Sequence, residues 1–220
     1  MGSAVRKGRN MPESFDLDRV LEHLVSSRPV FHSEADFQFA FAWSAITLYP
    51  TLEVKLESHP TPNESLDLAL FDPISNEGLA IEFKYKTGAW DGVVNGESYS
   101  LKSHGGSDIG CYDIVKDITR IERFSEGKAG WKGYVITLTN ESGYWNLRNH
   151  GKATNAGAFR VSHGLTLNGI REWGPNTGGT KKGREQSLVI KGSYDLKWRN
   201  YSKLSDRAAG TFKLLVVAIK

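Results

Sequence analysis

The chain is 220 residues long, and 39% of its residues are hydrophobic and 24% charged, which is typical of globular proteins. No apolar run reaches the roughly 20 residues of a membrane span, and residues 1–10 lack the apolar core of a signal peptide. The single cysteine, Cys111, excludes an internal disulfide and a zinc site built from several cysteines. We therefore expect one cytoplasmic domain over residues 1–220, with no membrane partner.

The net charge of +3 is unevenly distributed along the chain. Residues 1–110 hold 9 Lys and Arg against 16 Asp and Glu, whereas residues 111–220 hold 19 against 9. This asymmetry suggests a polyanionic partner for the basic half, although solubility alone also explains it. An acidic metal pocket beside a basic surface is the combination that a nucleic-acid hydrolase needs.

Two helices are expected near the N-terminus. Residues 14–26 place their apolar side chains on one helical stripe and indicate a packing helix that ends before Pro29. Residues 33–48 begin at Ser33 with a near capping box and carry a second apolar face. Glu34 lies in the first turn of this second helix, where the helix dipole favours a negative charge.

The next segments predict β-structure. Residues 51–57 alternate apolar and charged side chains and predict a half-exposed strand, which a loop over residues 58–63 follows. Residues 64–86 predict a β-hairpin, because two strand-like runs flank a segment rich in turn formers. Strand side chains alternate between faces, so one face of the first strand is expected to carry Leu66, Leu68 and Leu70.

The opposite face of this hairpin carries Asp67, Glu82 and Lys84. A turn centred near residues 74 and 75 places Asp67 directly opposite Glu82, with Cβ atoms about 5 Å apart. Two carboxylates at this spacing are able to bind one cation, and Lys84 projects from the same face. The alternative is an ordinary solvent-facing polar face in which Lys84 forms salt bridges with Asp67 or Glu82.

This pattern resembles the PD-(D/E)XK phosphodiesterase superfamily, the restriction-endonuclease-like nucleases. The residues that carry the resemblance are Asp67 and the run Glu82-Phe83-Lys84 at the end of an apolar strand, while Leu66 stands where the family pattern has a proline. The resemblance covers about residues 30–140. It implies an α/β fold with a restriction-endonuclease-like core, α-β-β-β-α-β, in which helices flank a central mixed sheet.

The resemblance also implies a Mg²⁺ site, at which Mn²⁺ would substitute. An acidic residue on the preceding helix completes this site in many members, and Glu34 is our candidate ahead of Asp36 and Gln38. The implied metal ligands are Asp67, Glu82, Glu34 and the backbone carbonyl of Phe83. Lys84 would orient the attacking water or help to deprotonate it. The expected catalytic residues are Asp67, Glu82, Lys84 and Glu34. Many members act as dimers, so a homodimer is compatible with the resemblance.

The glycine-rich residues 87–110 predict either a mobile loop over the site or a short hairpin. His104 in this stretch is more simply a surface residue than a phosphate contact. Residues 111–124 predict a helix with one face toward the core, and residues 133–139 an interior strand. The outer side of the helix is expected to carry Asp113, Lys116, Asp117 and Arg120. Lys116 and Arg120 either contact phosphate or pair along the helix with Asp113 and Asp117.

Residues 140–207 are rich in glycine, aromatic and basic residues, and we expect a basic β insertion or a substrate-binding elaboration of the core. Its aromatic residues are suited to stack on unpaired bases, or else they anchor the irregular insertion. Residues 177–184 resemble an exposed basic loop, and residues 211–219 predict a buried final strand. The candidate nucleic-acid contacts of the whole chain are Lys102, Lys116, Arg120, Lys181, Lys182 and Arg184.

The expected function is a Mg²⁺-dependent endonuclease that hydrolyses phosphodiester bonds in DNA. The alternatives are a catalytically silent nucleic-acid-binding protein on the same fold and a nuclease directed at RNA. A zinc hydrolase and Ser-His-Asp chemistry are disfavoured, because the six histidines lack H-E-x-x-H spacing and no G-x-S-x-G motif is present. Gly178 and Gly183 have the spacing of a P-loop, but Arg184-Glu185 replaces the required Lys and Ser/Thr.

Overall fold

The computed structural model describes residues 15–61, 64–147, 154–175 and 181–219. Its main sheet has six strands in the order β1-β2-β3-β6-β10-β9. Their bounds are Glu53–Thr61 (β1), Glu64–Asp72 (β2), Glu77–Lys86 (β3), Trp131–Thr139 (β6), Arg199–Lys203 (β9) and Thr211–Ile219 (β10). β3 and β6 are parallel and the other neighbouring strands are antiparallel, so the sheet is mixed.

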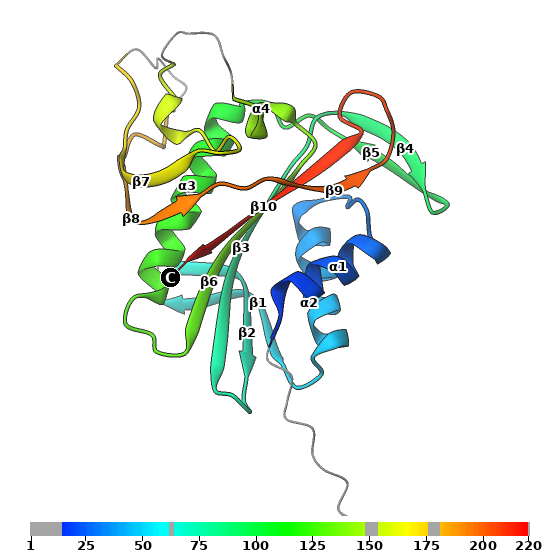
Figure 1. Cartoon of the computed structure of the whole chain (residues 1–220), viewed down its shortest axis with the longest axis vertical. Helices are drawn as coiled ribbons and strands as arrows, with labels where there is room; N and C mark the ends of the chain where they lie inside the picture. Colours follow the sequence, from blue (N-terminus) through cyan, green and yellow to red (C-terminus); the bar gives the residue numbers. More distant parts are fainter. Residues whose placement is uncertain (1–14, 62–63, 148–153, 176–180, 220) are drawn as a thin grey trace, which may run out of the picture.

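Helices cover both faces of this sheet (Figure 1). The first two helices, α1 (Leu17–Ser27) and α2 (Glu34–Leu48), share one apolar cluster with side chains of the sheet that include Leu68, Ile81 and Phe83. The third helix, α3 (Ser107–Ser125), shares a second cluster with sheet residues that include Ala80, Val135 and Leu215. The expected α/β class, with a central mixed sheet flanked by helices, is confirmed.

The helix that positions Glu34 begins as predicted. Ser33 is the N-cap of α2, and its hydroxyl accepts a 3.1 Å hydrogen bond from the backbone N–H of Asp36. α2 ends at Leu48, before Pro50, because the residue that precedes a proline is pushed out of the helical region. α1 is also present, but it begins at Leu17 with Asp16 as its cap, three residues later than predicted.

Two expectations for the hairpin region are wrong. β1 extends to Thr61, so residues 58–61 belong to a strand and not to a loop. Leu66 does not share a cluster with Leu68 and Leu70, because it packs in the cluster on the α3 face. The β2–β3 ladder runs from Asp72 opposite Glu77 to Leu68 opposite Ile81. Leu66 lies beyond this ladder, although it still pairs with Ser58 of β1, beside Glu57, which has a positive φ.

Residues 87–110 contain the short hairpin that was one of the two expectations. β4 (Trp90–Val94) pairs with β5 (Glu97–Leu101) around a turn in which Asn95 and Gly96 both have positive φ. α3 then begins at Ser107, four residues earlier than predicted. β6 and β10 occupy the interior of the main sheet, as their apolar sequences predict.

The C-terminal third packs on α3 rather than standing apart from it. A short helix α4 (Ser142–Trp145) and a 3₁₀ turn η1 (Gly157–Phe159) lead to the two-stranded sheet of β7 (Thr166–Arg171) and β8 (Leu188–Asp195). Glu122 on α3 holds β8, since its carboxylate accepts hydrogen bonds from Gly192 N–H at 2.7 Å and from the Tyr194 hydroxyl at 2.8 Å. β9 falls within residues 140–207, the expected insertion, but it joins the main sheet beside β10.

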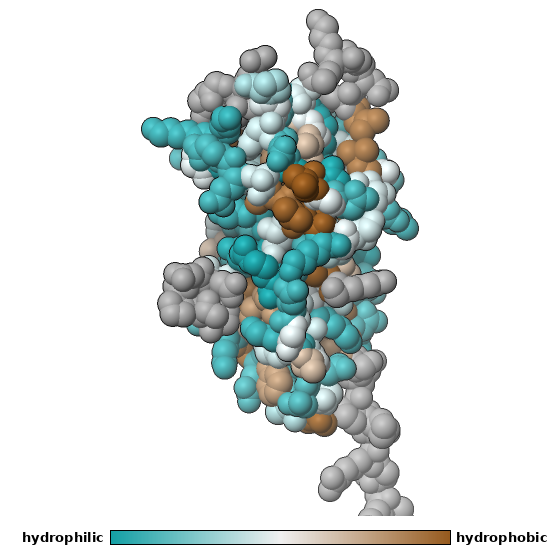
Figure 2. Space-filling model, turned by 90° about the vertical axis from the view of Figure 1, so that its left-hand side faces the viewer, coloured by the Kyte–Doolittle hydropathy of each residue, from teal (hydrophilic) through white to brown (hydrophobic). Residues whose placement is uncertain are grey.

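Of the two alternatives for the aromatic side chains of residues 140–207, anchoring rather than stacking on bases holds for five that are buried: Tyr144, Phe159, Tyr194, Trp198 and Tyr201. The exposed hydrophobic residues of this region include Ile170 and Val189, which lie opposite each other on β7 and β8. Figure 2 views this side of the molecule and shows small hydrophobic patches on a largely hydrophilic surface. Among the described residues, no helix combines the length and apolarity that crossing a membrane requires.

Candidate active site

Two carboxylates lie along one edge of β3. Continuing the β2–β3 ladder by one residue puts Asp67 opposite Glu82, and at that point Asp67 Oδ2 accepts a 2.7 Å hydrogen bond from the Phe83 N–H. Two residues further on, Glu34 Oε2 accepts a 2.7 Å hydrogen bond from the Tyr85 N–H. The N–H and C=O groups of one strand residue point to the same side. The Phe83 carbonyl therefore faces the same edge as the two carboxylates.

Lys84 lies between these groups and α3. Its Nζ is 2.8 Å from Asp117 Oδ2, 3.9 Å from Glu34 Oε1 and 2.9 Å from the Phe83 carbonyl oxygen. Burial lowers the pKa of Lys84, but the carboxylates of Asp117 and Glu34 outweigh it and raise the pKa above its usual range. Lys84 therefore keeps its proton at neutral pH.

Glu82 is fully buried and forms an ion pair with Arg120 of α3. The same Arg120 Nη2 donates a 2.8 Å hydrogen bond to Asp117 Oδ1. Burial, with the nearby carboxylates of Asp67 and Asp117, raises the pKa of Glu82 to about 9. The second oxygen of Glu82, Oε1, is buried and has no hydrogen-bond partner among the described residues. A buried oxygen of this kind costs free energy unless something else binds it.

The site carries more acidic than basic groups. Four carboxylates (Glu34, Asp67, Glu82 and Asp117) meet two cationic side chains (Lys84 and Arg120), which leaves two negative charges in excess when all are ionised. Burial raises the pKa of Glu34 and of Asp117, although Lys84 opposes both shifts. Like charges at close range disfavour ionisation, so this cluster favours the arrival of protons or of a cation.

Within the described residues, no three His, Cys, Asp or Glu side chains form a group that is arranged to hold a metal ion. The available donors are instead Asp67, the unpartnered Oε1 of Glu82 and the Phe83 carbonyl. Mg²⁺ is usually bound by one or two carboxylates and keeps several waters or phosphate oxygens as its other ligands. These donors are oxygen atoms of the type that Mg²⁺ takes, and Glu34, the other expected ligand, lies next to them on the same edge of β3.

The structure brings all four expected catalytic residues (Asp67, Glu82, Lys84 and Glu34) to β3. The two other candidates on α2 lie in different surroundings. Asp36 forms an ion pair with Arg28 at 2.8 Å, and Gln38 is buried in the helix packing. The carboxylate closest to Lys84 is that of Asp117, and not that of Asp67 or Glu82, which were the expected partners.

Asp117 is the site residue that the sequence reading missed. It was expected on the outer side of the helix, and this is wrong, because Asp117 is 4% exposed and faces the sheet. The signal was present in the sequence: Asp117 follows the buried Ile114 by three residues and precedes the buried Ile121 by four. That spacing puts it on the apolar stripe of the helix. The expected pairing of Asp117 with Arg120 is confirmed.

The candidate nucleic-acid contacts are unequally available. Lys102, Lys116 and Lys182 are exposed, and Lys181 is partly buried. Arg184 forms two hydrogen bonds with Asp113 of α3, at 2.7 and 3.1 Å, so Asp113 pairs with Arg184. Residues 177–180 of the expected basic loop lie outside the described residues. Nucleic-acid contact by the exposed lysines stays a prediction.

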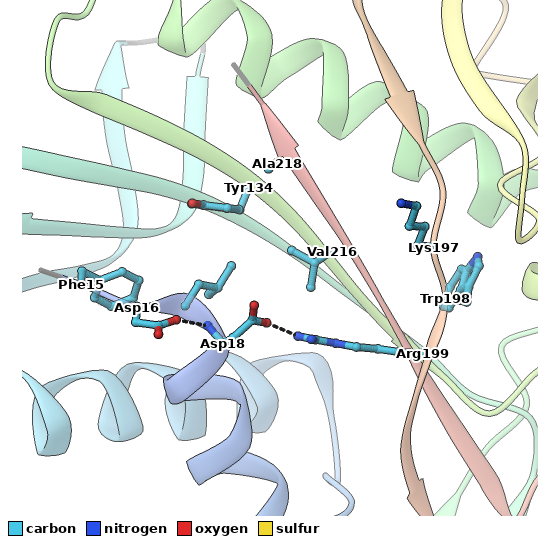
Figure 3. A pocket seen from close by; sticks show the side chains of 10 residues that line it. Phe15, Asp16, Asp18, Tyr134, Lys197, Trp198, Arg199, Val216 and Ala218 are labelled. Atoms are coloured by element: carbon cyan, nitrogen blue, oxygen red, sulfur yellow. Dashed lines mark hydrogen bonds and ion pairs between the residues drawn. The ribbon is translucent and has the colours of Figure 1, made fainter.

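A separate cavity of about 630 Å³ lies between the start of α1 and strands β6 and β10 (Figure 3). Its acidic groups are already engaged: Asp16 accepts the N–H of Asp18, and Asp18 forms a 2.6 Å ion pair with Arg199. These contacts cap α1 and link it to β9. These structural contacts account for the acidic side chains of this cavity without a ligand.

Comparisons of the chain with protein-family models, with curated proteins and with solved structures gave no match.

Proposed function

We propose that this protein is a Mg²⁺-dependent nuclease with a restriction-endonuclease-like core, which hydrolyses phosphodiester bonds in DNA. The observation that carries the proposal is the meeting of Glu34, Asp67, Glu82 and Lys84 around β3, from three separate elements. The element order α2-β1-β2-β3-α3-β6, with the β4–β5 hairpin between β3 and α3, supports it, because the PD-(D/E)XK resemblance implies the order α-β-β-β-α-β.

Asp67, Glu82 Oε1 and the Phe83 carbonyl would hold the ion. When bound, Mg²⁺ supplies positive charge that polarises the scissile phosphodiester and makes water a better nucleophile. The pKa of Glu82 is raised to about 9, so at neutral pH this side chain would release its proton to solvent when a cation binds it.

Lys84 acts as a fixed positive charge. A lysine that keeps its proton cannot accept one from water, so of the two expected roles we assign it orientation and not deprotonation. Its ammonium group, held by Asp117 and the Phe83 carbonyl, would bind a phosphate oxygen and offset the charge that develops in the transition state.

Glu34 is the group best placed to take the proton of the attacking water. One of its oxygens is fixed by the Tyr85 N–H, and its side chain is 37% exposed, so it remains in reach of solvent. Burial raises its pKa, and a general base works best when its pKa lies near the operating pH.

A cleavage assay tests this proposal. Plasmid, single-stranded DNA and RNA are incubated with the protein in Mg²⁺ or Mn²⁺, and again in EDTA. We expect metal-dependent cleavage of DNA that Asp67→Ala, Glu82→Ala and Lys84→Ala abolish without loss of folding. Asp206 is 92% exposed and pairs with Lys203 and not with a site residue, so Asp206→Ala is the matched carboxylate control. Full activity in all three site variants would refute the assignment, and cleavage of RNA alone would change the substrate class.

One observation favours a second candidate, a nucleic-acid-binding protein that does not cleave. Arg120 of α3 is paired with Glu82, one of the acids that the nuclease would use to hold its ion, as in a purely structural contact. Binding of DNA without any metal-dependent product in the same assay would select this candidate.

A further inference from the structure

A cavity of about 460 Å³ adjoins the candidate active site. It lies between the start of α2, the end of β3 and the base of the β4–β5 hairpin, which projects from the main sheet (Figure 1). Glu34 and Tyr85 line it together with Lys86, Lys102 and His104. Glu34 and Tyr85 also take part in the site around β3, so the cavity borders that site.

The cavity stands where ligands commonly bind in α/β proteins. β3 and β6 are parallel up to Lys86 opposite Thr139, and the cavity lies at the carboxyl end of β3. In open α/β sheets, ligands bind in crevices outside the carboxyl ends of parallel strands. The position therefore favours a binding site independently of the charges.

Lys86 continues the line of Lys84 along β3. The two side chains leave the same face of the strand, about 6.6 Å apart along it, which is close to the spacing of neighbouring phosphates in a nucleic-acid strand. Lys86 is near enough to Glu34 and His104 to influence the pKa of each. Lys86 thus adds positive charge at about the distance of one neighbouring phosphate from Lys84 and the carboxylates beside it.

His104 is fixed as a neutral hydrogen-bond donor. Its Nδ1 accepts a 3.0 Å hydrogen bond from the Thr87 N–H, which leaves the ring proton on Nε2. The Thr87 hydroxyl donates a 2.7 Å hydrogen bond to the Lys102 carbonyl, so Thr87 ties the two loop residues together. Burial and the charge of Lys86 lower the pKa of His104. A neutral donor beside two lysines suits an anionic oxygen.

We propose that this cavity is a phosphate subsite, in which Lys86, Lys102 and His104 bind the internal phosphodiester that neighbours the one at Asp67 and Glu82. The inference rests on the proposed function, because it places the second phosphate relative to the first. It assigns the path of one substrate strand: from β3 toward the β4–β5 hairpin.

The test measures binding without cleavage. A fluorescent single-stranded DNA with hydroxyl groups at both ends is titrated with protein in EDTA at several salt concentrations, and anisotropy gives the affinity. Lys86→Met and Lys102→Met remove charge but keep side-chain length. We expect each to weaken binding and to reduce the slope of log affinity against log salt by about 0.7, the share of one phosphate contact in a single strand.

Lys132→Met is the matched control, since Lys132 is 60% exposed and lies on β6 near Glu77, at the far end of the strand. Thermal melting confirms that each variant is folded. Unchanged affinity and slope in the Lys86 and Lys102 variants, an equal loss in the Lys132 variant, or no binding by the native protein overturns the subsite.

The cleavage assay keeps the two proposals apart. If cleavage depends on metal but the salt slopes of the Lys86 and Lys102 variants are unchanged, the subsite is overturned and the proposed nuclease function is supported. The expected slopes without any cleavage support the subsite and overturn the nuclease.

Discussion

At the scale of single residues, the carboxylates around β3 differ mainly in burial. Glu82 is fully buried, whereas the Glu34 side chain is 37% exposed. Unequal surroundings separate the pKa values of paired acids, and that separation is how one site divides acid–base work from charge stabilisation. We therefore expect Glu82 to bind the metal ion and Glu34 to accept the proton of the attacking water.

Glutamine variants separate these two roles. Glu34→Gln keeps an oxygen for the Tyr85 N–H but cannot take a proton, so we expect kcat to fall by about 10²- to 10⁴-fold. Mg²⁺ affinity, measured by calorimetry, should remain near that of the native protein. Glu82→Gln should instead weaken Mg²⁺ binding. The reverse pattern, with affinity lost at Glu34 and kept at Glu82, would contradict the assignment.

Glu82 also predicts how stability depends on pH in the absence of metal. Its pKa is about 9 in the folded protein and about 4.5 when unfolded, so between these values the folded state binds the extra proton. Stability is then full at low pH and falls as the pH rises through this window. Urea unfolding in EDTA at pH 5, 7 and 9 should show a steeper decline for the native protein than for Glu82→Gln. Equal declines would show that Glu82 does not titrate in this way.

At the scale of elements, the site depends on how closely α3 packs against β6. Gly133 lies on β6 directly under α3, and a Cβ added there would overlap the side chain of Ile121. The neighbour of Ile121 on α3 is Arg120, which forms an ion pair with Glu82 on β3. The glycine therefore sets the distance at which Asp117 and Arg120 reach the carboxylates of the sheet.

Gly133→Ala should displace α3 or strain Ile121, and we expect a loss of about 1–3 kcal/mol in the free energy of unfolding. Cleavage should fall as well, since Lys84 and Glu82 lose the geometry of their partners. Gly157→Ala is the control, because its added Cβ would meet only Thr154 Oγ1 at 3.6 Å, an ordinary contact. A Gly133 variant as stable as the control would show that close packing at this point is not required.

At the scale of the whole molecule, local sequence signals predicted most elements of the core. Ser33 as a cap follows from its residue type and position, the stripes of α1, α2 and α3 from helical periodicity, and β6 and β10 from their apolar runs. Asp67 and Glu82 came together because a hairpin fixes its own register. These features depend on residues near each other in sequence.

Long-range packing accounts for what the sequence did not predict. The ion pairs of Asp117 with Lys84 and of Arg120 with Glu82 each join residues more than 30 positions apart, so the sequence does not reveal these partners. The aromatic residues of the C-terminal third are buried because β7 and β8 pack on α3, which their own composition does not reveal. The joining of β9 to β10 likewise depends on tertiary pairing.

The central claim is that β3 presents a divalent-cation site, and Mn²⁺ tests it most directly, as a stand-in for Mg²⁺ with a measurable anomalous signal. Crystals of the native protein are soaked in Mn²⁺, and Glu82→Gln crystals serve as the control. We predict an anomalous peak in contact with Asp67, Glu82 Oε1 and the Phe83 carbonyl that is lost in the control. An empty site with Arg120 still bound to Glu82, or a peak elsewhere in the molecule, would contradict the account.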